Sequence, residues 1–211
     1  MRFRPLVLVC LLLAGCAGIE RGIAVLTHSP STDPGRAPAG VYHADPGHTT
    51  VAFGVVHLGY STYLGRFDHV DAELDFLPDD PTASTLVVRI STASVDSNNP
   101  AVDEALREEL FRVAHYPEIV FRGVRAERTG ERTGTLTGAL TMGGRTHEVT
   151  LDVVFNGAAK NPLTGAPTLG FSATGTLDRG RWGLARWYPA VARKVAIRIE
   201  VEFVLEDAPD Q

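Results

Sequence analysis

The first sixteen residues carry the clearest reactive group of the chain. Arg2 and Arg4 precede an apolar run over Leu6–Leu13, and the run ends in the lipobox Leu13-Ala14-Gly15-Cys16. The small residues before the cysteine leave room for a signal peptidase that cuts in front of Cys16. The freed Cys16 then accepts a diacylglyceryl thioether and an acylated amine, and several acyl chains anchor a protein far more firmly than one chain does. The sequence predicts a lipoprotein signal peptide over 1–15 and lipidation at Cys16.

The same segment bears on where the protein resides. Leu6–Leu13 is too short to span a bilayer as a helix. An ordinary cleaved signal, or an uncleaved anchor helix, is the alternative interpretation. The segment resembles that of bacterial lipoproteins, and Ala17 follows the cysteine where an Asp would retain a lipoprotein at the inner membrane. The resemblance implies a cell-envelope protein, anchored in the outer membrane and facing the periplasm.

Other residue types that could do chemistry do not form a catalytic motif. Gly170–Gly175 approximates a nucleophile elbow, but its second glycine is one place late and the segment alternates like a strand. His147-Glu148 lacks the second histidine of a zinc-binding helix. The remaining candidates for a metal site are scattered histidines near turns: His43, His48, His57 and His69. Because these histidines lack ligand spacing, we expect no metal site. Because the catalytic motifs are incomplete, we also expect no enzyme activity and no cofactor.

Composition narrows the possible partners. The chain has 211 residues and a formal net charge of −5. Removing residues 1–15 takes away two arginines and no acid, so the mature protein is more acidic still. Blocks of Lys and Arg that would neutralise phosphates are missing, and we expect no nucleic-acid partner. Cys10 leaves with the signal and Cys16 is lipidated, which excludes disulfides and thiol catalysis in the folded part.

A change of pattern separates a tether from a folded domain. The segment from Ala17 to Gly40 is rich in chain breakers and short of periodicity, as flexible linkers are. Alternation of apolar and polar residues begins near Val41 and continues to Leu205, and such alternation indicates strands with one buried face. We expect a flexible tether over 16–40, one domain over 41–206 and a tail over 207–211.

One segment departs from the alternation. Between Asn99 and Val113, the apolar residues Val102, Leu106 and Leu110 recur every four positions. This spacing predicts an amphipathic helix, started by Asn99-Pro100 and ended before the next proline. We expect this helix to cap one part of the domain.

About eight strands joined mostly by short turns favour an all-β fold, either a sandwich or an up-and-down barrel. Long strands such as Gly65–Leu77 and Arg193–Leu205 would leave exposed edges in an open sheet, and a barrel removes them. We therefore expect an antiparallel eight-stranded, lipocalin-like barrel with one capping helix. Small inward residues such as Ala173 would leave a ligand lumen between larger ones, whereas a filled core is the alternative.

The order and spacing of several motifs resemble one protein family. These motifs are Tyr42–Phe53, His57-Leu58-Gly59, Gly65-Arg66-Phe67, Leu106-Arg107, Leu110-Phe111, Tyr116–Phe121, Gly138–Gly144 and Asp178–Gly183. The chain resembles the YceI-like proteins, which are polyisoprenoid-binding, lipocalin-like periplasmic barrels. The resemblance runs from Tyr42 to about Phe203. It departs at Thr49, where the family usually has Ser, and at Ala192-Arg193, where it usually has Gly-Asp.

The resemblance implies a hydrophobic tunnel that holds an isoprenoid, a quinone or a fatty-acyl chain. We expect its apolar wall to include Phe53, Val55, Phe76, Phe121, Leu140, Phe155, Phe171 and Ala173. A polar head group needs a few polar contacts at the mouth. The candidates are His57, Arg179, Arg181 and Trp182, because each lies beside a strand end or turn. Arg179 is the main candidate, since a guanidinium offers paired donors to a carboxylate or a quinone carbonyl.

Three functional hypotheses follow from the sequence. The favoured one is an envelope lipoprotein that binds an apolar lipid for carriage, sequestration or stress protection, with the membrane contacted through Cys16. The alternatives are a structural or interaction lipoprotein with a filled barrel, and a small-molecule enzyme that uses the lumen as its active site.

Overall fold

The computed structural model describes residues 22–206, so the signal peptide, Cys16 and the tail over 207–211 lie outside the described residues. Eleven strands form one continuous antiparallel sheet. They are β1 (Gly40–Ala44), β2 (Thr50–His57), β3 (Ser61–Phe67), β4 (Val70–Phe76), β5 (Thr85–Ser91), β6 (Val95–Asp96), β7 (Glu118–Arg128), β8 (Thr133–Met142), β9 (Arg145–Lys160), β10 (Pro167–Asp178) and β11 (Val191–Leu205). Short 3₁₀ turns are η1 (Pro34–Arg36), η2 (Pro81–Ala83), η3 (Thr92–Ser94) and η5 (Arg179–Trp182).

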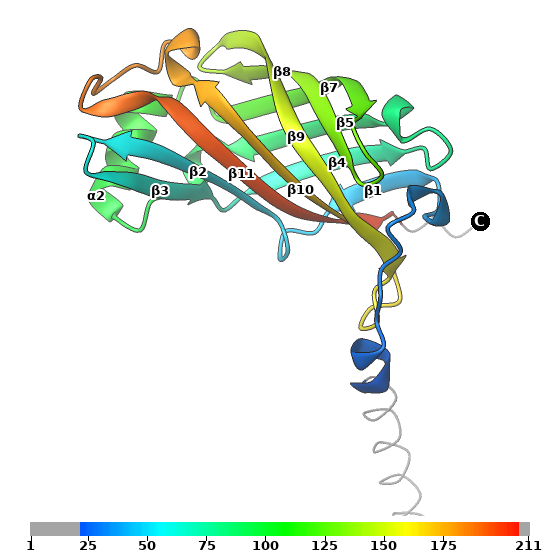
Figure 1. Ribbon diagram of the computed structural model, residues 1–211. Helices are drawn as coiled ribbons and strands as arrows, with labels where there is room; N and C mark the ends of the chain where they lie inside the picture. Colours follow the sequence, from blue (N-terminus) through cyan, green and yellow to red (C-terminus); the bar gives the residue numbers. More distant parts are fainter. Residues whose placement is uncertain (1–21, 207–211) are drawn as a thin grey trace, which may run out of the picture.

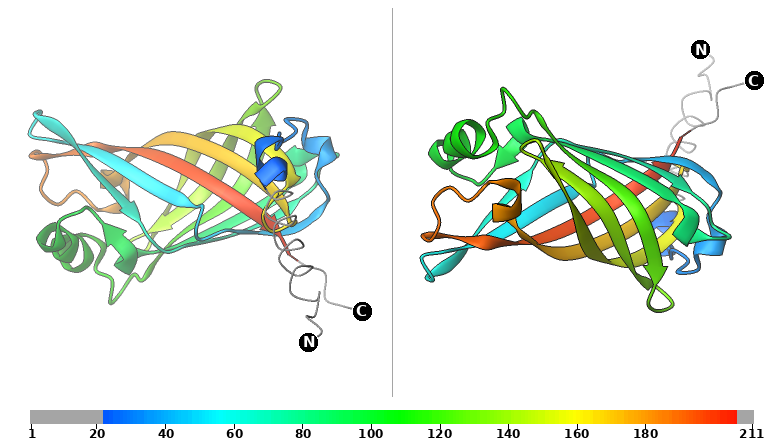
Figure 2. Two further views of the ribbon diagram at one scale, coloured as in Figure 1. Left: turned by 90° about the horizontal axis from the view of Figure 1, so that it is seen from below. Right: turned by 90° about the horizontal axis from the view of Figure 1, so that it is seen from above.

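The sheet closes into a barrel with eight wall strands, as the sequence predicted (Figure 1). β1 and β2 run in the same direction and pair with successive parts of β11. On the other side, β3 pairs with β2 and β4 pairs with β1; next to them, β6 pairs with β3 and β5 pairs with β4. The consecutive strands β1 and β2, β3 and β4, and β5 and β6 therefore each form one long wall strand with a break. Figure 2 shows the strands crossing the barrel obliquely, as closure of eight strands requires.

The breaks correct one detail of the sequence interpretation. The expected single strand over Gly65–Leu77 is interrupted at Asp68-His69, where β3 ends and β4 begins. At this point the backbone is held by the neighbouring turn: the amide of Asp68 donates to the Ser94 carbonyl, and that of His69 donates to the Ser94 hydroxyl, both at 3.0 Å. The wall bends here without losing its hydrogen bonds, which periodicity alone does not reveal.

The predicted helix is present and spans Pro100 to Phe111. It begins as α2 (Pro100–Ala105), with Asn99 accepting from the amides of the first turn, and continues as the π-helical turn η4 (Leu106–Phe111). Arg112 then adopts the left-handed conformation with φ 53° and ends the helix. No helix in the described part of the chain is long and apolar enough to span a membrane.

Part of the predicted tether is attached to the barrel. Ser31 and Ala158 exchange backbone hydrogen bonds of 2.9 and 2.8 Å. Ala37 is buried, and the hydroxyl of the fully buried Tyr42 donates to the Pro38 carbonyl at 2.8 Å. The segment over 30–40 is therefore packed against the barrel, and the expectation of a free linker up to residue 40 is wrong for it. Its backbone amide and carbonyl groups extend the β9 edge, which the lack of periodicity concealed.

Candidate functional site

An apolar cavity of about 310 Å³ lies inside the barrel. This volume falls at the lower end of the range for small-molecule sites, which is about 300–1,000 Å³. Its wall away from the mouth is built from inward side chains of all the wall strands: Val51, Val70, Ala72, Leu74, Phe76, Leu86, Val88, Ile90, Ile119, Phe121, Leu136, Leu140, Met142, Val149, Leu151, Val153, Phe155, Phe171, Ala173, Leu177, Ile197, Ile199, Val201 and Phe203. The alternating pattern positions these residues, because successive side chains of a strand point to opposite faces.

The cavity opens at one end of the barrel. Its exposed lining residues belong to the turn between β7 and β8 and to the connection between β4 and β5, and Pro34 of η1 lies beside them. The residues at this rim are Pro34, Pro81, Thr82, Ser84, Ala126, Glu127, Arg128, Glu131, Arg132, Thr133, Gly134 and Thr135. This open end lies opposite α2 in Figure 1. A ligand would enter past a polar rim and then meet an apolar wall.

Large side chains close the other end. Trp182 is only 2% exposed, and its indole Nε1 donates to the Leu140 carbonyl at 3.0 Å. Its ring meets that of His147 edge-on, with centroids 5.1 Å apart. Phe67, Phe111 and Leu184 belong to the same buried cluster. The cavity therefore ends against a packed core and not at a second opening.

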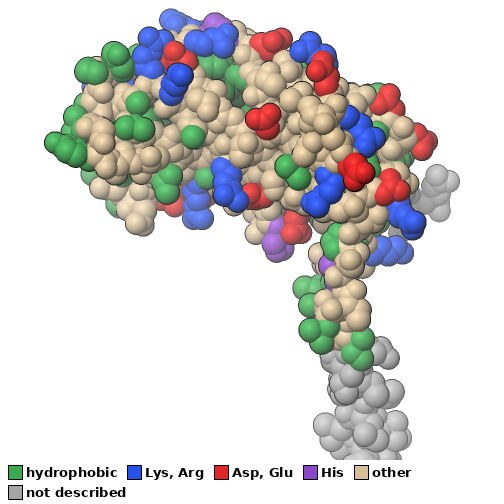
Figure 3. All heavy atoms as spheres, in the orientation of Figure 1, with side chains coloured by type: hydrophobic (Ala, Val, Ile, Leu, Met, Phe, Trp, Pro, Cys, Tyr) green, Lys and Arg blue, Asp and Glu red, His purple; other side chains and the backbone are tan. Residues whose placement is uncertain are grey.

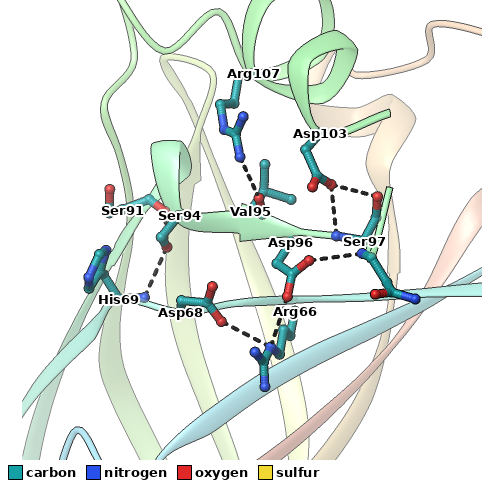
Figure 4. A network of polar contacts seen from close by, with 11 residues as sticks. Arg66, Asp68, His69, Ser91, Ser94, Val95, Asp96, Ser97, Asp103 and Arg107 are labelled. Carbon is teal, nitrogen blue, oxygen red and sulfur yellow. Dashed lines mark hydrogen bonds and ion pairs between the residues drawn. The ribbon is translucent and has the colours of Figure 1, made fainter. Parts of the chain in front are cut away.

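A polar network holds the helix over this closed end (Figure 4). The buried carboxylate of Asp103 accepts from the Ser97 amide at 2.7 Å and from the Ser97 hydroxyl at 2.5 Å. Arg107 donates to the carbonyls of Ala93 and Val95 at 3.0 and 3.1 Å. These bonds link the helix to the segment that contains η3 and β6. They place Phe111 in the core, where its ring packs against that of Phe67 with ring centroids 5.7 Å apart.

The structure brings together six of the residues that the sequence analysis assigned to the apolar wall. They are Phe76, Phe121, Leu140, Phe155, Phe171 and Ala173. Phe155 and Phe171 pair across β9 and β10, with ring centroids 5.2 Å apart, and Phe171 meets Phe203 at 6.1 Å. Ligand contact by these residues stays a prediction, while their position on the cavity wall is observed.

Phe53 and Val55 do not line the cavity, although the sequence analysis placed them on its wall, and His57 is absent from the mouth, where it was expected. β2 continues beyond the cavity floor toward the closed end of the barrel. The Phe53 ring lies over Gly65, where an added Cβ would come within 2.4 Å of it, and it packs on Phe67 at 5.6 Å. His57 is exposed at the strand end. Alternation gives the face of a residue but not its depth along the barrel, which explains the error.

Arg179 and Trp182 are also absent from the mouth. Arg179 is 5% exposed and lies at the closed end of the barrel, in η5. Its guanidinium donates to four backbone carbonyls: those of Leu184 and Arg186 in the loop between η5 and β11, and those of Val191 and Ala192 at the start of β11. Desolvation on burial lowers the pKa of Arg179 from its ordinary value. The predicted head-group residue is instead a structural clamp for this loop.

Thr49, between β1 and β2, is a cavity residue that the sequence analysis noted only as a departure from the family pattern. Away from the rim it is the only polar side chain in the described cavity wall. Its hydroxyl oxygen is also the only buried side-chain polar atom without a hydrogen-bond partner among residues 22–206. The sequence does not predict this position, because the path of the turn between β1 and β2 decides whether the threonine side chain faces the cavity or solvent.

We expect Thr49→Val to stabilise the ligand-free protein by about 1 kcal/mol, because valine keeps the shape and removes an unsatisfied buried hydroxyl. For a chain of this size, that change raises the melting temperature by roughly 2–4 °C. Thr50→Val is the matched control, since Thr50 is the exposed neighbour and gives no such gain. A lower melting temperature for Thr49→Val would show that the hydroxyl does make a stabilising hydrogen bond.

Three side chains outside the barrel could together hold a cation. The ligand atoms of Asp45, His48 and Glu202 lie within 4.8 Å of one another. Within the group, His48 Nδ1 and Asp45 Oδ2 are 2.8 Å apart. This hydrogen bond lowers the pKa of Asp45 and raises that of His48, with Glu202 adding to the second effect. The contact is that of an exposed ion pair across the Asp45-Pro46 turn, which accounts for the proximity without a metal.

The fold and parts of the sequence match known proteins. The YceI-like domain family matches residues 42–203. A UPF0312 protein of Pseudomonas putida is 35% identical over 173 residues, which cover 81% of this chain and 89% of that protein. The crystal structure of the Campylobacter jejuni YceI protein covers 72% of this chain and 90% of its own, with 29% identity and a TM-score of 0.66. A polyisoprenoid binding domain from Saccharophagus degradans, with 12% identity, matches in fold alone, covering 80% of this chain and 100% of its own at a TM-score of 0.61.

Proposed function

Because the chain belongs to the YceI-like domain family, we propose that it binds an apolar ligand in the barrel cavity and carries or sequesters it in the cell envelope. The ligand class is an isoprenoid, a quinone or a fatty-acyl chain. The lipobox supports a protein held to the membrane through acylated Cys16, with the outer membrane as the proposed location.

The observation that carries this proposal is the one-ended apolar cavity. Its wall is aliphatic and aromatic along its depth, and its polar lining residues other than Thr49 gather at the rim. Apolar ligand surface that enters such a cavity gains roughly 25 cal/mol for each Å² removed from water. A closed floor beneath Met142 favours retention of a tail inserted from the rim. The fold neighbour named as a polyisoprenoid binding domain supports the same ligand class.

The same geometry supports binding without catalysis. General acid–base or nucleophilic chemistry needs titratable groups next to the bound ligand. In the described cavity, the titratable lining residues are Glu127, Arg128, Glu131 and Arg132, all at the rim. We therefore propose that the protein releases its ligand chemically unchanged.

Native mass spectrometry tests the proposal on protein purified from membranes without organic solvent. We expect a bound apolar species that organic extraction removes and that can be identified after release. Protein that carries no such species, and that does not bind an added polyene fatty acid, would contradict the proposal.

Filling the cavity is expected to weaken binding. Ala173 lines the cavity on β10, whereas its neighbour Thr174 is exposed on the outer face. We expect Ala173→Phe to weaken binding of a polyene fatty acid at least tenfold, about 1.4 kcal/mol, because the ring occupies ligand space. Thr174→Phe is the matched control and keeps the affinity. If Ala173→Phe binds normally but unfolds easily, by the roughly 1–3 kcal/mol typical of overpacking, the wall at this point is packed core.

A further inference from the structure

The cavity opens at the end of the barrel from which the chain leads back to Cys16. Pro34 lines the cavity at its rim. Ser31, three residues earlier in the chain, is hydrogen-bonded to Ala158 near the end of β9. From Ser31 the described chain continues to Gly22 away from the barrel, on the side opposite α2 (Figure 1). The mouth of the cavity and the route to the anchor therefore share one end of the molecule.

Chain length keeps the anchor close to the start of the described chain. Six residue steps separate Gly22 from Cys16, and a fully extended chain covers at most about 3.6 Å per residue, or roughly 20 Å in all. For comparison, β11 has 15 residues, and at about 3.3 Å per residue it extends roughly 50 Å. Cys16 can therefore lie no farther than roughly 20 Å from Gly22, a shorter span than the length of β11.

Exposed apolar side chains lie along this route. Ile23, Val25 and Leu26 are exposed on the helical turn at the start of the described chain, and Leu163 is 68% exposed at the tip of the β9–β10 connection. Figure 3 shows apolar side chains gathered on this N-terminal segment beneath the barrel. Apolar side chains of this kind insert into the boundary between lipid head groups and acyl chains.

We propose that the open end of the barrel docks on the bilayer that holds acylated Cys16, and that the ligand passes directly between this bilayer and the cavity. The inference rests on the proposed function. It adds a partner, which is a lipid surface, and a route by which the ligand enters and leaves. Passage through the rim spares the apolar tail from crossing water, which would cost about 25 cal/mol for each Å² exposed.

Charge contributes little to this docking. Arg128 and Arg132 at the rim are accompanied by Glu127 and Glu131. Both signs occur together, so the rim has no strong preference for anionic lipid. The anchor and the apolar side chains supply the contact. We therefore expect docking to change little with salt concentration.

A rival apolar surface exists at the closed end of the barrel. Its exposed side chains are Val56, Leu58, Tyr60, Leu64, Trp187 and Tyr188. The cavity does not open there, and the chain toward Cys16 does not leave from there. Docking through this surface would hold the mouth away from the membrane, and it is the outcome that the experiment has to exclude.

Single introduced cysteines distinguish the two orientations. Residues 22–206 contain no cysteine, and acylation blocks Cys16, so Leu163→Cys and Tyr60→Cys can each be labelled with an environment-sensitive fluorophore. The acylated full-length lipoprotein is placed in phosphatidylcholine vesicles that carry a quencher on the lipid head group. We expect strong quenching at position 163 and little at position 60. Equal quenching at both, or stronger quenching at 60, would overturn the proposal.

Ligand loading tests the route separately. The probe is a polyene fatty acid supplied either from vesicles or directly in buffer. We expect Leu163→Glu to slow loading from vesicles several-fold, with equal final occupancy and unchanged loading from buffer, while Tyr60→Glu behaves as wild type. Equal loading rates from vesicles for all three proteins would contradict direct transfer but not the proposed function. Failure of the wild type to bind the probe from either source would instead contradict the proposed function.

Discussion

Arg179→Ala is expected to lower the free energy of unfolding by at least about 3 kcal/mol and to leave the ligand affinity of the folded protein unchanged. The guanidinium satisfies four backbone carbonyls, with Nε at 2.8 Å from the Ala192 oxygen and Nη2 at 2.7 Å from the Val191 oxygen. Hydrogen bonds to charged groups contribute roughly 1.5–3 kcal/mol each, and alanine leaves buried acceptors without donors. The stated loss corresponds to only one or two of the four bonds.

Arg181→Ala is the matched control, because Arg181 is the exposed arginine of the same 3₁₀ turn. We expect it to change stability little. Urea unfolding of both variants gives the stability, and titration with a fatty acid and with a headless hydrocarbon gives the affinities. If Arg179→Ala kept wild-type stability but lost affinity for the fatty acid alone, the original head-group hypothesis would be correct and the clamp assignment wrong.

Arg179→Lys should not rescue the loop. A single ammonium has three donors on a compact head, whereas the guanidinium spreads its donors over a planar fork that reaches carbonyls on both sides. We expect its stability to lie close to that of Arg179→Ala. This comparison separates a requirement for positive charge from a requirement for the geometry of the fork.

Cys16→Ser is expected to abolish anchoring completely. Serine lacks the sulfur that accepts the diacylglyceryl group, so the precursor stays unacylated and, since processing depends on acylation, uncleaved. Metabolic labelling with a fatty acid and the apparent mass of the protein measure both steps. Cys10→Ser is the matched control, because it changes the other cysteine of the signal segment and leaves the lipobox intact.

A Cys16→Ser protein that is still cut and still partitions into detergent like wild type would rule out lipoprotein processing. It would also remove the membrane partner from the docking proposal, since the acylated Cys16 is what would hold the protein on the bilayer. The cavity and the proposal that it binds an apolar ligand would be unaffected by that result.

The sequence by itself determined the architecture. Alternation with period two determines which face of each strand is buried, and long alternating runs such as the one over β11 require closure to avoid exposed edges. The spacing of Val102, Leu106 and Leu110 likewise predicted the helix over Pro100–Phe111, and Asn99 predicted its start. These properties are local, and each follows from neighbours in the chain.

Only the tertiary structure decided the depth of each inward residue along the barrel. Phe53 and Phe76 both alternate inward, yet Phe76 lines the cavity while Phe53 packs beneath its floor. The difference arises from the stagger of strands in a closed sheet, which offsets residues of neighbouring strands along the axis. No periodicity within one strand contains that offset.

The open end was likewise decided by tertiary contacts. A turn such as Asp178–Gly183 suits a mouth or a plug equally well, because both need a short connection with polar residues. In this barrel, burial of Trp182 and satisfaction of loop carbonyls by Arg179 close that end. Exposure of the β7–β8 turn leaves the other end open. The charge of an arginine is local information, but whether it meets solvent, ligand or backbone depends on which segments the fold brings around it.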